Sequence, residues 1–298
     1  MVEIVCYRDD DYTTSWIPHS LANKIALALK EKLGIKIKRA GELKEWILET
    51  MENDPSSTAV VFAQDVCPDT VFDRDTPEAL IRLYVDHGGN VIWIGDIPFY
   101  YRGRKGKLKP KELEEKDRGL ISSMNLLGVV PLMTFTPTNV VEITDDGRIL
   151  GLHHRWQSHR PIYYPGKDIR ILAKSRPLVA WTLQWIKGME IKYPLLKRII
   201  KSLKVGISIL PVRVEVSTTG EEAKAQAAPG IPVFTYEELP SAWIKYYGKG
   251  RFIRLWDNPF PLAHEEKGLR ILEKRVIPEL IRVLNNFRNF LTKHRYLL

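Results

Sequence analysis

Three strand-length runs of mostly apolar residues, with little alternation between apolar and polar side chains, constrain the fold of this chain most. They read VVFAQ at 60–64, VIWIG at 91–95 and FIRLW at 252–256. A strand with one face in water alternates between apolar and polar residues, whereas a strand covered on both faces does not. The three runs therefore predict the central strands of a mainly parallel sheet that has helices on both faces.

Helical patterns alternate with strand patterns along the first hundred residues. Leu21, Ile25, Leu29 and Leu33 recur at spacings of four before Gly34, a typical helix stop. The other predicted elements in this part are strands at 3–7 and 35–38 and helices at 41–53 and 76–88. Strands that alternate with helices predict an α/β fold with a doubly wound, mainly parallel sheet of the flavodoxin-like kind.

The length suits one large α/β domain or two ordinary ones, and we expect residues 1–298 to form one α/β domain. An Asp-Gly turn predicts a hairpin at 140–150. Three further segments depart from the strand and helix rhythm. They are a basic exposed loop at 102–119, an insertion at 186–232, and a C-terminal amphipathic helix at 267–291 that we expect to be kinked at Pro278.

Charge and cysteine content bound the class of protein. The formal net charge of +9 favours anionic partners and keeps nucleic acid as an alternative. Abundant Lys, Arg and Glu also suit a solvated, thermostable surface. No apolar run is long enough for a membrane span, so we expect no membrane contact. Two cysteines without metal-type spacing suit a reducing, cytoplasmic location, and a single disulfide between them is the alternative.

Three segments together resemble the class I glutamine amidotransferase-like superfamily. The first, LIRLYVDHGGNVIWIGD at 80–96, is similar to the helix, glycine pair and strand that lead to the nucleophile elbow. The second, VEITDDGRILGL at 141–152, and the third, AWIKYYGKGRFIRLWDNP at 242–259, resemble its non-amidotransferase, trehalose-utilisation-type branch. The resemblance implies the scaffold of that superfamily over about two-thirds of the chain.

The catalytic pair of a glutaminase is missing from these segments. Such an enzyme needs a cysteine at the sharp turn after the strand and a histidine after the last strand. The elbow positions hold Asp96 and Ile97, and no Cys, Ser or Thr occurs from Trp93 to Tyr101. The last strand is followed by no histidine before His264. We therefore expect no glutaminase activity.

Carboxylates follow four of the predicted strands. In open parallel sheets, ligands bind outside the carboxyl ends of the strands. The candidates for a ligand or metal cleft are Asp9, Asp10, Asp65, Asp96 and Asp257. Several converging acids would suit a divalent cation such as Mg²⁺ or Mn²⁺. The alternative is that each acid caps a helix or pairs with a nearby arginine.

Cys67 and a group of three histidines are weaker indications of a functional site. Cys67 follows a strand at the same edge and is either a thiol nucleophile or a buried structural residue. His153, His154 and His159 lie within seven residues of one another, but their spacing matches no standard zinc pattern. An exposed or anion-binding segment is the alternative.

Cationic side chains near two tyrosines suggest an anion-binding surface. Tyr100 and Tyr101 precede the basic loop, and rings beside a cationic loop suit stacked bases and phosphates. The anion-binding candidates are Arg102, Arg104, Lys105, Lys107, Arg155 and Arg160. A solvated loop over packed tyrosines is the alternative.

Three functions remain open at this stage. The first is a non-catalytic amidotransferase-like domain that acts as a ligand-sensing or protein-interaction module. The second is a metal-dependent hydrolase that acts on a phosphate- or sugar-containing substrate through the strand-end aspartates. The third is a nucleic-acid-associated accessory protein. The expected partner is a protein or a small ligand, and association between copies of the chain also stays open.

Overall fold

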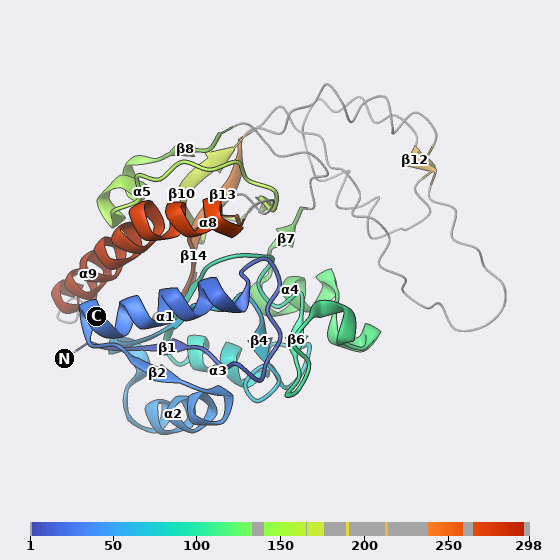
Figure 1. The fold of residues 1–298 in the computed structure, drawn as a ribbon, viewed down its shortest axis with the longest axis horizontal. Coiled ribbons are helices and arrows are strands. Elements are labelled where there is room, and N and C mark those ends of the chain that lie inside the picture. Colours follow the sequence, from blue (N-terminus) through green and yellow to red (C-terminus); the bar gives the residue numbers. More distant parts are fainter. Residues whose placement is uncertain are drawn as a thin grey trace.

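An eight-stranded sheet organises the chain (Figure 1). The structure is a computed structural model that describes residues 2–132, 140–164, 166–175, 189–190, 212–213, 238–258 and 265–294. Along the sheet, the strands are β2 (Lys36–Lys38), β1 (Glu3–Tyr7), β3 (Thr58–Phe62), β5 (Asn90–Trp93), β14 (Gly250–Arg254), β13 (Leu239–Tyr247), β10 (Ile169–Ser175) and β8 (Glu142–Ile143).

The first five strands in this order are parallel, and the last three continue the sheet in antiparallel pairs. The prediction of the central strands is confirmed, because β3, β5 and β14 lie side by side and run in the same direction. Every residue of these three strands is buried. The fold is therefore a mixed α/β fold built on a mostly parallel sheet.

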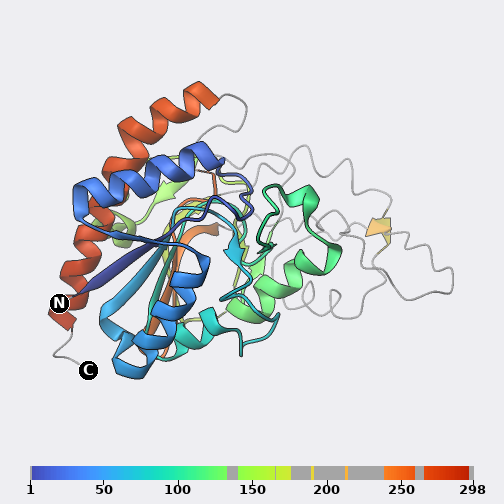
Figure 2. The same cartoon turned by 60° about the horizontal axis from the view of Figure 1, so that its bottom comes forward.

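Helices cover the sheet on both sides. They are α1 (His19–Leu33), α2 (Ala40–Asn53), α3 (Leu80–Asp86), α4 (Leu120–Leu127), α5 (Asp145–Leu150), α8 (Glu265–Ile271) and α9 (Ile277–His294). Cys6 and Val61 pack with α1 and α9, whereas their neighbours Tyr7 and Phe62 pack with α2 and α3. Figure 2 shows α1 and the C-terminal helices on one side of the sheet and α2 on the other. Successive side chains of one strand thus enter two different cores.

Short elements complete the described part of the chain. Paired strands of two residues are β4 (Cys67–Pro68) with β6 (Arg102–Gly103), β7 (Val130–Pro131) with β9 (Ile162–Tyr163), and β11 (Met189–Glu190) with β12 (Val212–Arg213). Single 3₁₀ turns cover Pro55–Ser57, Pro110–Glu112 and Glu115–Asp117. Apart from β11 and β12, the insertion predicted at 186–232 lies outside the described residues.

The hairpin predicted at 140–150 is wrong. Only Glu142–Ile143 forms a strand, and the residues that follow it form α5. The Thr144 hydroxyl accepts the N–H of Gly147 at 3.1 Å, and such a side-chain cap favours the start of a helix. Gly147 has no room for a side chain, because a Cβ there would lie 2.1 Å from the carbonyl oxygen of Leu172.

Helix α3 begins later than predicted. The sequence pattern suggests a start at residue 76, but the helix starts at Leu80, whose N–H donates to Asp73 Oδ1 at 3.1 Å. The bond to Asp73 satisfies one of the free N–H groups at the helix start. The Asp73 carboxylate, and not Thr76, therefore caps the start of this helix.

The chain is helical over the segment where a C-terminal helix is predicted at 267–291, with an irregular turn near Pro278. Helix α8 is followed by a π-helical turn over Leu272–Val276, and α9 then begins. Pro278 has no N–H to donate to the preceding turn, which accounts for a break in the regular hydrogen-bond pattern at this point. Across the described residues, no helix is both long and apolar enough to span a bilayer.

Candidate functional site

Four carboxylates lie beyond the carboxyl ends of four parallel strands, as the strand order predicts. Asp9 follows β1, Asp65 follows β3, Asp96 follows β5 and Asp257 follows β14. All four are buried, with exposed fractions of 6%, 1%, 5% and 0% respectively. A buried carboxylate needs hydrogen-bond donors or a counter-charge. The donors of each acid therefore decide what this edge of the sheet can do.

Asp65 is bound by the backbone of the loop between β1 and α1. Its carboxylate accepts the N–H of Ser15 at 2.8 Å, of Trp16 at 2.7 Å and of Ile17 at 3.2 Å. Burial, with a smaller contribution from the Asp96 carboxylate, raises the pKa of Asp65 to about 7, although the N–H donors oppose the shift. Asp65 thus fixes the position of the loop that carries Ser15 and Trp16.

Asp96, which was predicted to lie at a nucleophile elbow, is also engaged by hydrogen-bond donors. Its carboxylate accepts the Ser15 hydroxyl at 2.8 Å and the N–H of Ile97 at 2.7 Å, and Arg160 Nε lies 3.4 Å from Oδ1. The N–H of Asp96 donates to Asp65 Oδ2 at 3.3 Å, so these two acids are neighbours. Gly95 allows this approach, because a Cβ there would lie 2.5 Å from the Asp65 Cβ.

Asp257 organises a different segment, residues 156–160. The carboxylate accepts the indole N–H of Trp156, the hydroxyl of Ser158 at 2.9 Å and the N–H groups of His159 and Arg160, both at 2.6 Å. Its four donors come from a loop about a hundred residues earlier in the chain. Asp257 is therefore the anchor that brings Arg160 to the carboxyl edge.

Asp9 and Asp10 complete the set of predicted acids. Asp9 Oδ2 accepts the N–H of Ala40 at 3.0 Å, at the start of α2, where a negative charge is favourable. The exposed Asp10 pairs with Arg8 at 2.5 Å, and Arg8 also donates to Gln64 at 3.0 Å. The structure therefore brings Asp65 and Asp96 together, while Asp9, Asp10 and Asp257 bind partners of their own.

Metal binding finds little support at this edge. In the part of the chain that the structure describes, no three His, Cys, Asp or Glu side chains form a group that could hold a metal ion. The donor sets agree with this finding, because Asp65, Asp96 and Asp257 each accept several N–H or O–H donors, which occupy the oxygens that a cation would need.

Aromatic and cationic side chains form a second layer at the carboxyl edge. The Arg160 guanidinium lies 4.3 Å from the centroid of the Trp16 ring, and the His159 ring meets Trp16 edge-on at 5.8 Å. Burial lowers the pKa of His159, which favours its neutral form. Burial, with Asp96 nearby, raises the pKa of Tyr101 to about 12. We refer to Ser15, Trp16, Asp96, Tyr101, His159 and Arg160 as the edge cluster.

The other histidines and cations of the 153–160 segment lie apart from the edge cluster. His153 and Arg155 are exposed, and the N–H of His154 donates to Glu279 on α9 at 2.6 Å. The three histidines do not form a metal site within the described residues. Of the candidates in this segment, His159 and Arg160 join the edge cluster. Ser15 and Trp16, which also belong to it, were not predicted from the sequence.

The basic loop differs from the prediction at Arg102 and Arg104, two of its three arginines. Arg102 pairs with Asp75 at 2.5 Å, and Arg104 pairs with Asp117 at 2.5 Å and with Asp69 at 3.1 Å. Both arginines are therefore held by carboxylates. The exposed positive charge of this segment lies on Lys105, Lys107, Lys109 and Lys111, followed by Lys116 and Arg118.

Neither cysteine can act as a nucleophile in this arrangement. Cys6 and Cys67 are both fully buried and unpaired. Burial raises the pKa of the Cys6 thiol to about 12 and that of the Cys67 thiol well above its ordinary value. Thiolate, and not thiol, is the reactive form, so both side chains are structural.

We therefore expect no reaction of the folded protein with a thiol reagent such as DTNB at pH 8. Unfolding in guanidinium chloride should release two reactive thiols per chain, which supplies the internal control. The same argument predicts no ammonia release from glutamine above background. A native thiol that reacts within minutes and is lost in Cys67→Ala would contradict the assignment.

The fold and these contacts define a mixed α/β protein whose strand-end carboxylates serve as internal hydrogen-bond acceptors. The chain belongs to the MJECL34 family, whose model matches residues 2–178. It is 36% identical over 101 residues to the uncharacterized protein MJECL34 of Methanocaldococcus jannaschii. That match spans 33% of this chain and 34% of the relative, about a third of each.

Two solved structures are similar at low identity. The cytoplasmic protein STM3548 from Salmonella typhimurium matches with a TM-score of 0.44 and 12% identity, over 90% of this chain and 86% of that one. A cold-adapted β-galactosidase from Rahnella sp. R3 matches with a TM-score of 0.37 and 12% identity, over 93% of this chain and 31% of that one. Likenesses of this degree say nothing about activity.

Proposed function

We propose that the protein is a non-catalytic, amidotransferase-like domain that senses a small ligand at the edge cluster. The observation that carries the proposal is the set of partners around Asp96. By its resemblance to the amidotransferase-like segments, Asp96 takes the place of the nucleophile, and in the structure it is bound by Ser15, Ile97 and Arg160. A carboxylate engaged by three partners is suited to organising a binding surface rather than to attacking a substrate.

The architecture supports the same proposal. Helices on both faces of a sheet with the order β2-β1-β3-β5-β14 are in keeping with a doubly wound, flavodoxin-like core. In such cores, ligands bind beyond the carboxyl ends of the strands. The edge cluster lies at that position.

The side chains of the edge cluster suggest what kind of ligand would bind there. Trp16 is partly exposed and offers an aromatic face, and Arg160, His159 and Tyr101 offer hydrogen-bond donors. Aromatic faces with a few polar groups suit a small polar molecule that has a flat ring or a sugar face. A protein partner that inserts a polar loop is the other form of the proposal.

A thermal-shift titration tests the proposal with glutamine, glucose and AMP as probes of three ligand classes. We expect at least one probe to raise the Tm without being consumed over several hours by NMR. A probe at about a hundred times its Kd adds roughly 2.7 kcal/mol of stability. Arg160→Gln should abolish the shift, because it removes the cation that lies against Trp16 and Asp96.

Arg155→Gln is the matched control, since Arg155 is exposed in the same segment. It should keep the full shift. Conversion of a probe that disappears in Asp96→Asn would show that the protein is an enzyme and would overturn the proposal. The absence of a shift with all three probes would count against ligand sensing at this edge.

A further inference from the structure

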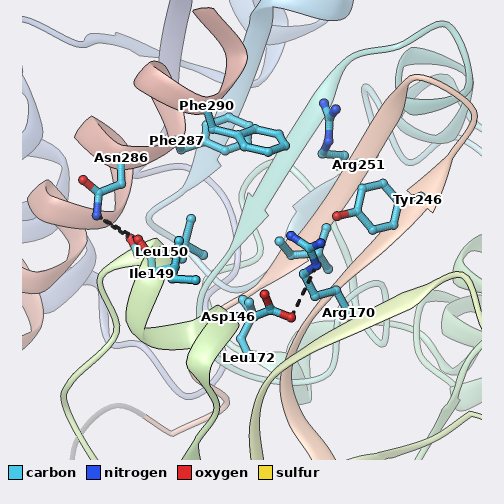
Figure 3. A pocket seen from close by; sticks show the side chains of 11 residues that line it. Asp146, Ile149, Leu150, Arg170, Leu172, Tyr246, Arg251, Asn286, Phe287 and Phe290 are labelled. Carbon is cyan, nitrogen blue, oxygen red and sulfur yellow. Dashed lines mark hydrogen bonds and ion pairs between the residues drawn. The ribbon is translucent and has the colours of Figure 1, made fainter. Parts of the chain in front are cut away.

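A pocket of about 80 Å³ lies at the opposite end of the sheet from the edge cluster. Figure 3 shows the side chains that line it. Its lining comes from α5, β10, β13, α9 and the first residues of β14. Because β14 begins at Gly250 and runs parallel to β5, this pocket is at the amino end of the parallel strands. The two sites therefore do not overlap.

The walls of the pocket are mostly apolar. The apolar lining residues are Ile149, Leu150, Leu172, Ile244, Phe287 and Phe290. Asn286 holds two of the walls together, because its side-chain amide donates to the carbonyl oxygens of Ile149 at 3.3 Å and Leu150 at 3.1 Å. These bonds tie α9 to the end of α5. These hydrogen bonds thus fix the shape of the pocket.

Two arginines and one aspartate give the pocket an excess of positive charge. Arg170 pairs with Asp146 at 3.4 Å. Arg251 is only 9% exposed, and within the described residues no carboxylate lies at ion-pair distance from it. Its hydrogen bond is to Asn90 Oδ1 at 3.2 Å, and its Nε has no acceptor.

A buried guanidinium without a counter-charge is an unusual arrangement. The rings of Phe290 and Tyr246 flank it, with their centroids 5.2 and 5.8 Å from the guanidinium carbon. Ring faces attract a cation but do not neutralise it. Figure 3 shows the Tyr246 hydroxyl pointing into the pocket beside Arg170, where it can donate a hydrogen bond. The lining therefore fits a ligand with a single negative charge.

We infer that this pocket binds a small monocarboxylate with a short, branched apolar body. The Arg170 and Arg251 guanidinium groups and the Tyr246 hydroxyl would hold the carboxylate, and the apolar walls would hold the body. A cavity of about 150 Å³ holds the six carbon atoms of benzene, so a pocket about half that size encloses about three carbon atoms, such as the isopropyl end of a branched chain. The single uncompensated charge favours a carboxylate over a doubly charged phosphate.

The test is a ligand-observed NMR titration of the full chain with 4-methylpentanoate and its neutral isostere 4-methylpentanamide. We expect the acid to bind at least about tenfold more tightly than the amide, since a hydrogen bond between charged groups is worth about that factor. Arg251→Met should reduce the affinity for the acid at least about tenfold and leave that for the amide nearly unchanged.

Arg170→Gln is a second variant in case Arg251→Met does not fold. The Arg170 side chain is about half exposed, at 48%, so its replacement should not prevent folding. It should weaken binding of the acid at least about threefold. Lys167→Gln removes the same charge from an exposed neighbouring position and should have no effect. Arg160→Gln should also bind the acid normally, which separates this pocket from the edge cluster.

Three results would overturn the inference. The first is equal affinity for the acid and the amide. The second is unchanged affinity in both Arg170→Gln and a folded Arg251→Met. The third is no binding of the acid at about 10 mM.

Discussion

Replacing Asp257 by Asn is expected to lower the free energy of unfolding by about 3–5 kcal/mol. Asp257 is fully buried and accepts donors from Trp156, Ser158 and the backbone of residues 159 and 160. An amide in its place would turn an N–H₂ group toward some of those donors. It would also remove the negative charge near Arg254, which is fully buried.

Urea unfolding followed by circular dichroism measures this effect. Asp145→Asn is the control, because the Asp145 side chain is 89% exposed and pairs with the exposed Arg148. That change should cost less than about 1 kcal/mol. A loss below about 1 kcal/mol in Asp257→Asn would show that segment 156–160 does not depend on this carboxylate.

Gly250→Ala is expected to destabilise the protein by about 3 kcal/mol. A Cβ at this position would lie 1.8 Å from the carbonyl oxygen of Val85 and 2.7 Å from that of Gly89. Both contacts are to backbone, at the end of α3 and just before β5. Relief would therefore require α3 to move away from the sheet, with loss of its packing.

Gly41→Ala is the matched control. Gly41 lies in α2, and a Cβ there would meet nothing within 4 Å. Alanine should therefore stabilise the helix by up to about 1 kcal/mol. Thermal unfolding of the two variants should move the Tm in opposite directions. A Tm within a degree of wild type for Gly250→Ala would mean that α3 and β14 are further apart than the structure places them.

The central sheet was predictable because its signal is local. Continuous apolar runs identified β3, β5 and β14, and the spacing of Leu21, Ile25 and Leu29 identified α1. The hairpin at 140–150 was predicted wrongly because an Asp-Gly pair suits a turn, but Thr144 caps a helix there. The packing of Gly147 against β10 also favours the helix over the hairpin. That contact could not be predicted, because β10 lies more than twenty residues further along the chain.

The candidate site at the carboxyl edge of the sheet was predictable only in part. Strand order alone places Asp9, Asp65, Asp96 and Asp257 beyond the carboxyl ends of their strands. What each acid binds depends on loops elsewhere in the sequence, since Ser15 and Trp16 reach Asp65 and Arg160 reaches Asp96. No spacing or motif in the sequence links those positions. Serine and tryptophan before a helix carry no functional pattern of their own.

The position of β14 between β5 and β13 has a consequence for synthesis of the chain on the ribosome. Strands β1, β2, β3 and β5 are complete by Trp93, but β14, which pairs with β5, begins only at Gly250. At about 5–20 residues per second, the apolar edge of β5 waits roughly 8–30 s for its partner. An open apolar strand edge is a site of aggregation. Production of the protein should therefore depend on chaperones that shield this edge, and truncation before residue 250 should yield insoluble material.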